Sequence, residues 1–165
     1  LYKQGWLHDM SKYSPTEFWV GAKYYQGTRS PNNAEREDIG YSSAWLHHKG
    51  RNKHHYEYWI DYSMQALPGG MAPVPMPDKY IAEMIMDRIA ASKVYMGGEY
   101  TDRSPLDYYY QGTDRAPIHP ETKAKLLYVL EMLAEEGEEK TFRFIKEELV
   151  QHKRCMDWHQ LEKAE

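Results

Sequence analysis

Residues 120–137, PETKAKLLYVLEMLAEEG, carry the most regular apolar pattern in the chain. Large apolar side chains recur there at the three- and four-residue spacing of one helical face, at Leu126, Leu127, Val129, Leu130 and Leu133. Pro120 stands where a helix can begin, and Gly137 stands where one can end. The stretch predicts a long helix that buries one face in a helical core.

The same signals recur toward the N-terminus. Pro77-Asp78 opens an amphipathic segment that we expect to be helical to about Met96, where Gly97-Gly98 stops it. Ser14-Pro15-Thr16-Glu17 has a capping serine, a proline at the first helical position and a glutamate three residues after the cap. It predicts a helix to about Tyr25. Ser42 or Ser43 could cap another helix over 41–48.

The rest of the chain yields shorter or irregular elements. We predict helices over 54–64 and around Phe142 to Leu149, with a short one beginning at Ser104. Residues 26–40 are interpreted as a polar loop with at most a short helical turn at 33–38, and 67–77 as an irregular connector rich in Pro, Gly and Met. No segment predicts a strand, so the expected fold class is all-α.

Length and composition limit which classes of protein this chain can belong to. The 165 residues are expected to form a single helical domain, 1–165, that lacks an N-terminal helix and ends in a polar tail at 151–165. A net charge of −4 without a basic stripe argues against nucleic acid as a partner. No apolar run approaches the length of a membrane span. The single cysteine, Cys155, fits a reducing compartment, and we expect a cytoplasmic protein.

Five of the eight histidines fall in two short stretches, His8-Asp9 and residues 47–55, HHKGRNKHH. Imidazole nitrogen with carboxylate oxygen suits a divalent metal ion. Gly50 and Asn52 tolerate left-handed backbone conformations, so they could fold the segment back and bring both doublets to one centre. Which of the four imidazoles at 47, 48, 54 and 55 would bind stays open.

Asp87 is a second residue that independently indicates a bound cation. On the helix predicted from Pro77 it shares a stripe with Tyr80, Met84, Ala91 and Val94, so it should face the interior. Burial of an ionised carboxylate needs a cation, a hydrogen-bond network or protonation to compensate. A salt bridge to a core-lining arginine or lysine is the alternative to a metal.

The ordered set His8-Asp9, the later histidine doublets and Asp87 resembles the HD superfamily of metal-dependent phosphohydrolases. The segments HDMSKYSP at 8–15 and AWLHHKGRNKHH at 44–55 resemble an uncharacterised, HD-like bacterial and phage family more closely still. The resemblance implies a helical bundle with its metal between helices. It also implies a histidine upstream of His8, which this sequence does not contain.

Carried over by position, the resemblance makes His8 and Asp9 an adjacent ligand pair and Asp87 the closing ligand. The doublets His47-His48 and His54-His55 correspond to the extra ligands of dinuclear members. The metal could be Mn, Fe, Co, Mg, Ni or Zn, as one ion or two. Lys12 matches a lysine found near phosphate in some HD subfamilies.

The leading hypothesis is a metal-dependent phosphohydrolase that acts on a small phosphorylated compound or nucleotide. Lys12, Arg51 and Asn52 would then hold the phosphate, with the arginine contributing its bidentate fork. No residue is assigned as catalytic. Two alternatives stay open: an HD-fold iron oxygenase, and a non-catalytic protein that binds a metal or a nucleotide.

Overall fold

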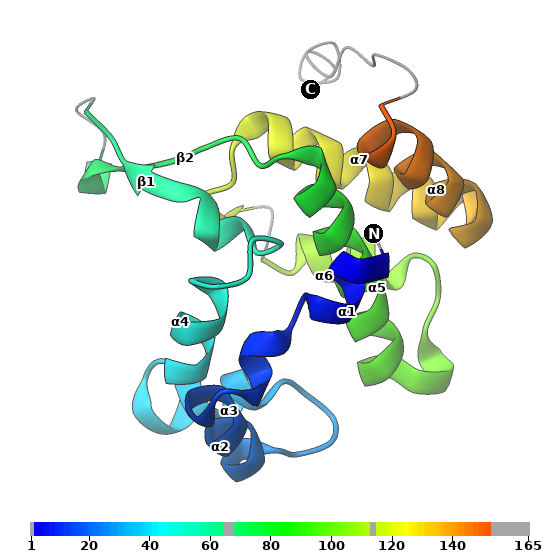
Figure 1. Cartoon of the computed structure of the whole chain (residues 1–165). Coiled ribbons are helices and arrows are strands. Elements are labelled where there is room, and N and C mark those ends of the chain that lie inside the picture. The colour runs from blue at the N-terminus through cyan, green and yellow to red at the C-terminus, as the bar shows by residue number, and fades with distance from the viewer. Residues whose placement is uncertain (1, 65–67, 113–114, 153–165) are drawn as a thin grey trace. The chain divides into compact units, whose positions relative to one another are not determined.

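The computed structural model describes residues 2–64, 68–112 and 115–152, and these are predominantly helical (Figure 1). Cα packing divides the chain into two compact units, Leu1–Tyr58 and Trp59–Glu165. The helical fold class is confirmed, apart from one small sheet. The HD-like architecture and the single domain stay predictions.

The first unit is a set of short helices joined by tight connections. Its elements are α1 (Tyr2–Leu7), a 3-10 segment (Met10–Tyr13), α2 (Pro15–Tyr24), α3 (Pro31–Ile39) and α4 (Ser43–Lys49). α2 packs against both α3 and α4. The sequence located the starts of α2 and α4 correctly: Ser14 Oγ accepts the Glu17 N–H at 3.4 Å, and Ser42 Oγ accepts the Trp45 N–H at 3.0 Å.

The helix α3 corrects the loop predicted for this region. Its sequence, PNNAEREDI, shows no apolar periodicity, which is why the pattern indicated only a turn. Its inward contacts are polar instead. The carboxylate of Glu35, only 2% exposed, accepts the hydroxyls of Ser42 and Ser43, each at 2.6 Å, and so anchors the start of α4. Gly40, with φ +84°, ends the helix in the left-handed conformation.

The interior of the first unit is unusually polar. Among its described residues, the buried apolar side chains are those of Ala34 and Ala44. The buried polar and charged side chains are those of Glu17, Glu35, Ser42, His48, Asn52 and His54. Isolated buried polar groups are costly, so this unit depends on how well these groups satisfy one another.

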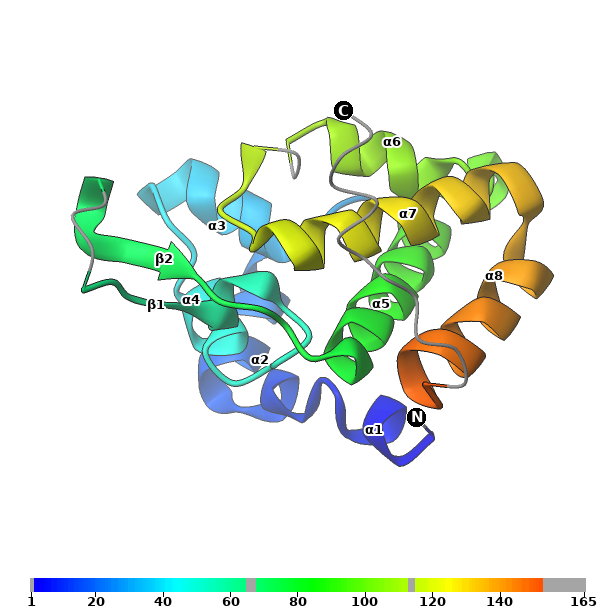
Figure 2. The same cartoon turned by 90° about the horizontal axis from the view of Figure 1, so that it is seen from above.

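The second unit has a conventional apolar core. Its helices are α5 (Asp78–Met96), α6 (Ser104–Tyr110), α7 (Pro120–Glu136) and α8 (Glu138–Phe144), followed by a π-helical segment (Ile145–Val150). α5 contacts α6, α7 and the π-helical segment, and α7 lies across α5 in both views (Figures 1 and 2). The fully buried side chains include those of Ile81, Ile85, Leu126, Leu130, Leu133 and Leu149. The helices predicted from Pro77 and Pro120 are therefore confirmed, and each buries an apolar face. The stripe expected to face the interior through Asp87 is buried only in part, because Val94 is 76% exposed.

A two-stranded antiparallel sheet corrects the prediction of no strands. β1 (Ile60–Tyr62) pairs with β2 (Met71–Pro73), with Asp61 opposite Ala72. The helix predicted over 54–64 is wrong: a short 3-10 turn at Tyr56–Trp59 leads directly into β1. Strands of three residues are too short to display an alternating pattern.

None of the helices in the described part of the chain has the length and hydropathy needed to cross a membrane. Most of the predicted polar tail, including Cys155, lies outside the described residues. A cytoplasmic location stays a prediction.

Candidate metal centre

The end of α4 and the loop after it bring the histidine doublets close together. The loop turns back because the backbone N–H groups of Arg51 and Asn52 both donate to the carbonyl of His48, each at 3.0 Å. The predicted reversal is present, but its expected cause is wrong. Gly50 has φ −75°, and Asn52 is not among the described residues with positive φ. Hydrogen bonds to one carbonyl, including the Asn52 side-chain amide at 2.9 Å, hold the turn.

Three of the imidazoles gather into one cluster. One ring nitrogen each of His48, His54 and His55 lies within 4.8 Å of the others, a separation that a shared metal ion can bridge. His48 and His54 are buried, and His55 is half-buried. The rings of His54 and His55 have centroids 4.1 Å apart. We call His48, His54 and His55 the histidine cluster.

Asp9 faces this cluster from the segment between α1 and the first 3-10 turn. Its Oδ1 lies 3.4 Å from Nε2 of His48 and 3.6 Å from Nε2 of His54. Oδ1 is buried and has no hydrogen-bond partner in the described part of the chain. Both distances exceed the usual hydrogen-bond range of about 2.7–3.2 Å. Two donors bound to zinc at roughly 2.0–2.1 Å in a tetrahedral site lie about 3.4 Å apart, so the separations suit shared ligation.

The other oxygen of Asp9 faces two different groups. Oδ2 lies 3.4 Å from Nε2 of His8, and it forms an ion pair with the ammonium of Lys12. Burial acts to raise the pKa of Asp9, but Lys12 and the nearby His48 and His8 outweigh it, so the pKa lies below its usual value. The carboxylate is therefore ionised at neutral pH. Nδ1 of His8 lies 2.7 Å from the carbonyl of Gly5, which accepts its N–H and directs Nε2 toward Asp9.

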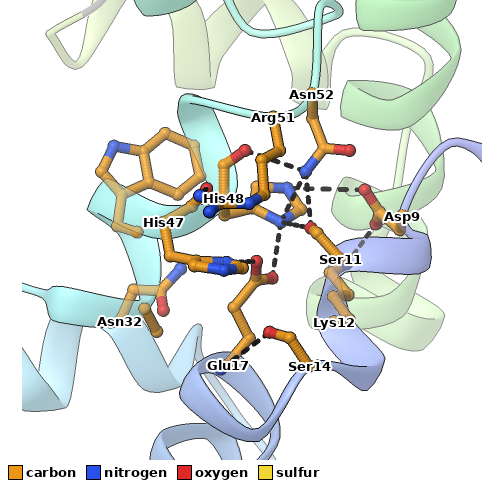
Figure 3. A network of polar contacts seen from close by, with 12 residues as sticks. Asp9, Ser11, Lys12, Ser14, Glu17, Asn32, His47, His48, Arg51 and Asn52 are labelled. Atoms are coloured by element: carbon orange, nitrogen blue, oxygen red, sulfur yellow. Dashed lines mark hydrogen bonds and ion pairs between the residues drawn. The ribbon is translucent and has the colours of Figure 1, made fainter.

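Glu17 is a site residue that the sequence did not reveal. Its carboxylate is 7% exposed and lies 2.6 Å from Nδ1 of His47 and 2.8 Å from Nδ1 of His48. Figure 3 shows both rings turned toward Glu17, with Asp9 beside His48. Burial acts to raise the pKa of Glu17, but hydrogen bonds from His47, Ser11 and His48 outweigh it and lower the pKa. Its place three residues after Ser14 indicated only a capping role.

The remaining predicted site residues have different surroundings. Asn52 is buried, and its amide donates inward to Ser11 Oγ at 2.7 Å. Arg51 is exposed and donates to the carbonyl of His47 at 3.2 Å. His47 is half-buried, and its ring is engaged by Glu17. Asp87 is half-buried on α5 in the second unit. The ligand role of Asp87 and the phosphate-binding roles stay predictions.

The arrangement combines imidazole nitrogens with one ionised carboxylate, the donor set typical of Zn, Mn, Fe and Co sites in proteins. The cluster His48, His54 and His55 could hold a metal ion, and Asp9 supplies an oxygen at compatible distances from two of its members. The donor set fits the metal that the sequence led us to expect.

A family model matches most of the chain. The model of DUF5662, described as a family of unknown function, matches residues 1–132, which contain every candidate site residue named above. No curated protein and no solved structure matches the chain.

Proposed function

The chain belongs to the DUF5662 family, whose function is not known, and we propose that it is a metal-dependent phosphohydrolase acting on a small phosphorylated compound or a nucleotide. The observation that carries the proposal is the position of Asp9 Oδ1. This buried carboxylate oxygen lies 3.4 and 3.6 Å from Nε2 of two buried histidines, His48 and His54.

The proposed ligands are Asp9, His48 and His54, with His55 as a further donor of the cluster. His8 lies against the second oxygen of Asp9 and could extend the site. When bound, a divalent ion would lower the pKa of a coordinated water and polarise a phosphoryl oxygen. The ionised state of Asp9 suits this role, because ligation requires a deprotonated carboxylate.

Cationic side chains near the cluster support a phosphorylated substrate. Lys12 is 60% exposed although its ammonium contacts Asp9, so it can face both the ligand set and the solvent. Arg51 is exposed on the loop that carries the cluster, and a guanidinium matches the geometry of a phosphate. Asn52 takes a different part in this proposal: its buried amide holds the loop, so it would shape the site rather than bind phosphate.

The experiment combines metal analysis with a test of turnover. The purified chain would be analysed for bound metal and assayed for phosphate release from nucleotides and phosphomonoesters with Mn, Co, Fe, Mg, Ni or Zn. The same assays on Asp9→Asn and His54→Gln should show loss of both metal and activity. His119→Gln is the matched control, because His119 precedes α7 in the second unit, outside the cluster.

Three results would contradict the proposal that this cluster is the active site of a phosphohydrolase. Phosphate release that persists in both ligand variants would show that the cluster is not the active site. Bound iron with oxygen consumption would favour the oxygenase alternative. Stoichiometric metal without turnover on any substrate would favour a non-catalytic binding protein.

A further inference from the structure

We propose that Glu17 is a positioning residue that fixes the orientation and the tautomer of His48, and with it His47, for metal binding. This inference rests on the proposed function insofar as His48 is a metal ligand. Its physical basis, the contacts of Glu17 with the two rings, is independent of any substrate.

The local sequence places Glu17 for this role and leaves its side chain available. It lies in the first turn of α2, where the partial positive charge of a helix N-terminus favours an anion. In a capping box its carboxylate would bind the backbone N–H of Ser14. That N–H instead donates to the carbonyl of Ser11 at 2.9 Å. The carboxylate of Glu17 therefore turns inward to α4.

The contacts determine where the ring protons lie. A carboxylate has no proton to donate and only accepts hydrogen bonds, and each oxygen of Glu17 lies within hydrogen-bond distance of one ring nitrogen, at 2.6 Å from Nδ1 of His47 and 2.8 Å from Nδ1 of His48. Nδ1 of His47 and Nδ1 of His48 must then each carry the proton. In the neutral form that a metal requires, an imidazole has one N–H, so Nε2 of His48 would then offer its lone pair, and this is the nitrogen that lies 3.4 Å from Asp9. Nδ1 of His48 also lies 3.1 Å from Ser11 Oγ and 3.0 Å from the side-chain nitrogen of Asn52, and both contacts are longer than the 2.8 Å to Glu17. The Asn52 nitrogen donates instead to Ser11 Oγ at 2.7 Å and to the carbonyl of His48 at 2.9 Å.

One carboxylate thus serves two adjacent imidazoles, one with each oxygen. Partners of this kind fix the ring orientation of metal-binding histidines, and their removal typically weakens metal binding about 10–100-fold. His47 lies outside the histidine cluster, so the structure assigns it to the Glu17 pair rather than to the ligand set. This separates the roles of two adjacent histidines that the sequence left equivalent.

Nitrogen-15 NMR of the metal-free full-length chain tests the inference directly, because histidine nitrogen shifts distinguish the two tautomers. In the unsubstituted chain, His47 and His48 should both be protonated at Nδ1. Glu17→Gln should shift at least one of them toward the Nε2-protonated form, since a carboxamide presents only one acceptor oxygen. It should also weaken Zn²⁺ binding about 10–100-fold in a chelator competition.

Glu35→Gln is the matched control. Glu35 is also a buried glutamate of the first unit, but it binds Ser42 and Ser43 rather than a histidine. It should leave both tautomers unchanged and Zn²⁺ affinity within about twofold, which separates loss of stability from loss of orientation.

The outcomes are distinguishable. An Nε2-protonated His48 in the unsubstituted chain overturns the inference, even if Glu17→Gln fails to fold. Unchanged tautomers and Zn²⁺ affinity in a folded Glu17→Gln overturn it as well. Absence of Zn²⁺ binding by the unsubstituted chain overturns the metal role, whereas the tautomers of the metal-free chain still show whether Glu17 orients the rings.

Discussion

Nε2 of His54 lies 3.6 Å from Oδ1 of Asp9, and this places a buried imidazole against a carboxylate oxygen that has no hydrogen-bond partner among the described residues. The first unit organises its interior around such polar contacts, with Ala34 and Ala44 as the buried apolar side chains described there. A small unit without an apolar core needs another source of stability. A bound cation is one such source.

Metal removal should therefore destabilise the chain. A ligand that binds only the folded state adds about 2.7 kcal/mol when its free concentration is one hundred times its Kd. Thermal unfolding followed by circular dichroism, with and without a chelator, should show a lower Tm in the chelated sample. Asp9→Asn and His54→Gln should lose most of this difference. An equal metal-dependent shift in both variants would mean that the ion binds elsewhere.

The buried carboxylate of Glu35 should make the first unit sensitive to acid. Burial acts to raise its pKa, but hydrogen bonds from Ser42, Ser43 and the Ala44 N–H lower the pKa below the ordinary value of 4.5. A group whose pKa is depressed by folding contributes stability above its unfolded pKa and loses it as pH falls through the folded value. Glu35→Gln should lower the free energy of unfolding by about 1.5–3 kcal/mol at pH 7.

Urea unfolding of the Glu35→Gln variant from pH 7 to pH 3 measures this dependence. The difference in free energy of unfolding between this variant and the unsubstituted chain should narrow as the pH falls below about 4.5. Glu37→Gln is the control, since Glu37 is an exposed residue paired with Arg29. A gap for Glu35→Gln that is constant with pH would show that its charge is not what stabilises the contact.

Lys125 should be a stability determinant of the second unit. Its ammonium lies 2.7 Å from both Asp78 and Glu121, and its side chain is 6% exposed. Removal of one partner from a buried ion pair typically costs about 3–5 kcal/mol, because the remaining charges lose their compensation. In chemical denaturation, Lys125→Met should lower the free energy of unfolding by an amount that approaches this range. Lys140→Met removes an exposed pair with Glu136 and should cost less than about 1 kcal/mol. Similar losses in the two variants would contradict the assigned burial effect.

The sequence predicted those parts of the fold that follow local rules. Caps and prolines located α2, α4, α5 and α7, because these signals act within one turn of the helix. It missed α3, whose inward contacts are made by a glutamate and serine hydroxyls rather than an apolar stripe. It missed β1 and β2 because three residues carry no measurable period.

The same limit applies to the candidate site. Histidine spacing pointed to a metal cluster, and three of the four histidines at 47–55 gather as such a cluster could. The contacts of His47 and His48 with Glu17 could not be predicted, because Glu17 lies thirty and thirty-one positions away in sequence. A glutamate three residues after a capping serine has the same local sequence whether it caps the helix or turns inward.

Gly137, between α7 and α8, provides a test of backbone geometry. Its φ of +80° is rarely adopted by residues with a side chain, and a Cβ there would lie 3.3 Å from Asp102 Oδ2. Gly137→Ala should therefore lower the free energy of unfolding by about 1–3 kcal/mol. Gly98→Ala is the matched control: its added Cβ would meet nothing within 4 Å, and no left-handed φ is required. We expect a change within about 0.5 kcal/mol for Gly98→Ala. Equal stability of the two variants in urea denaturation would mean that the junction between α7 and α8 relaxes to accept a side chain.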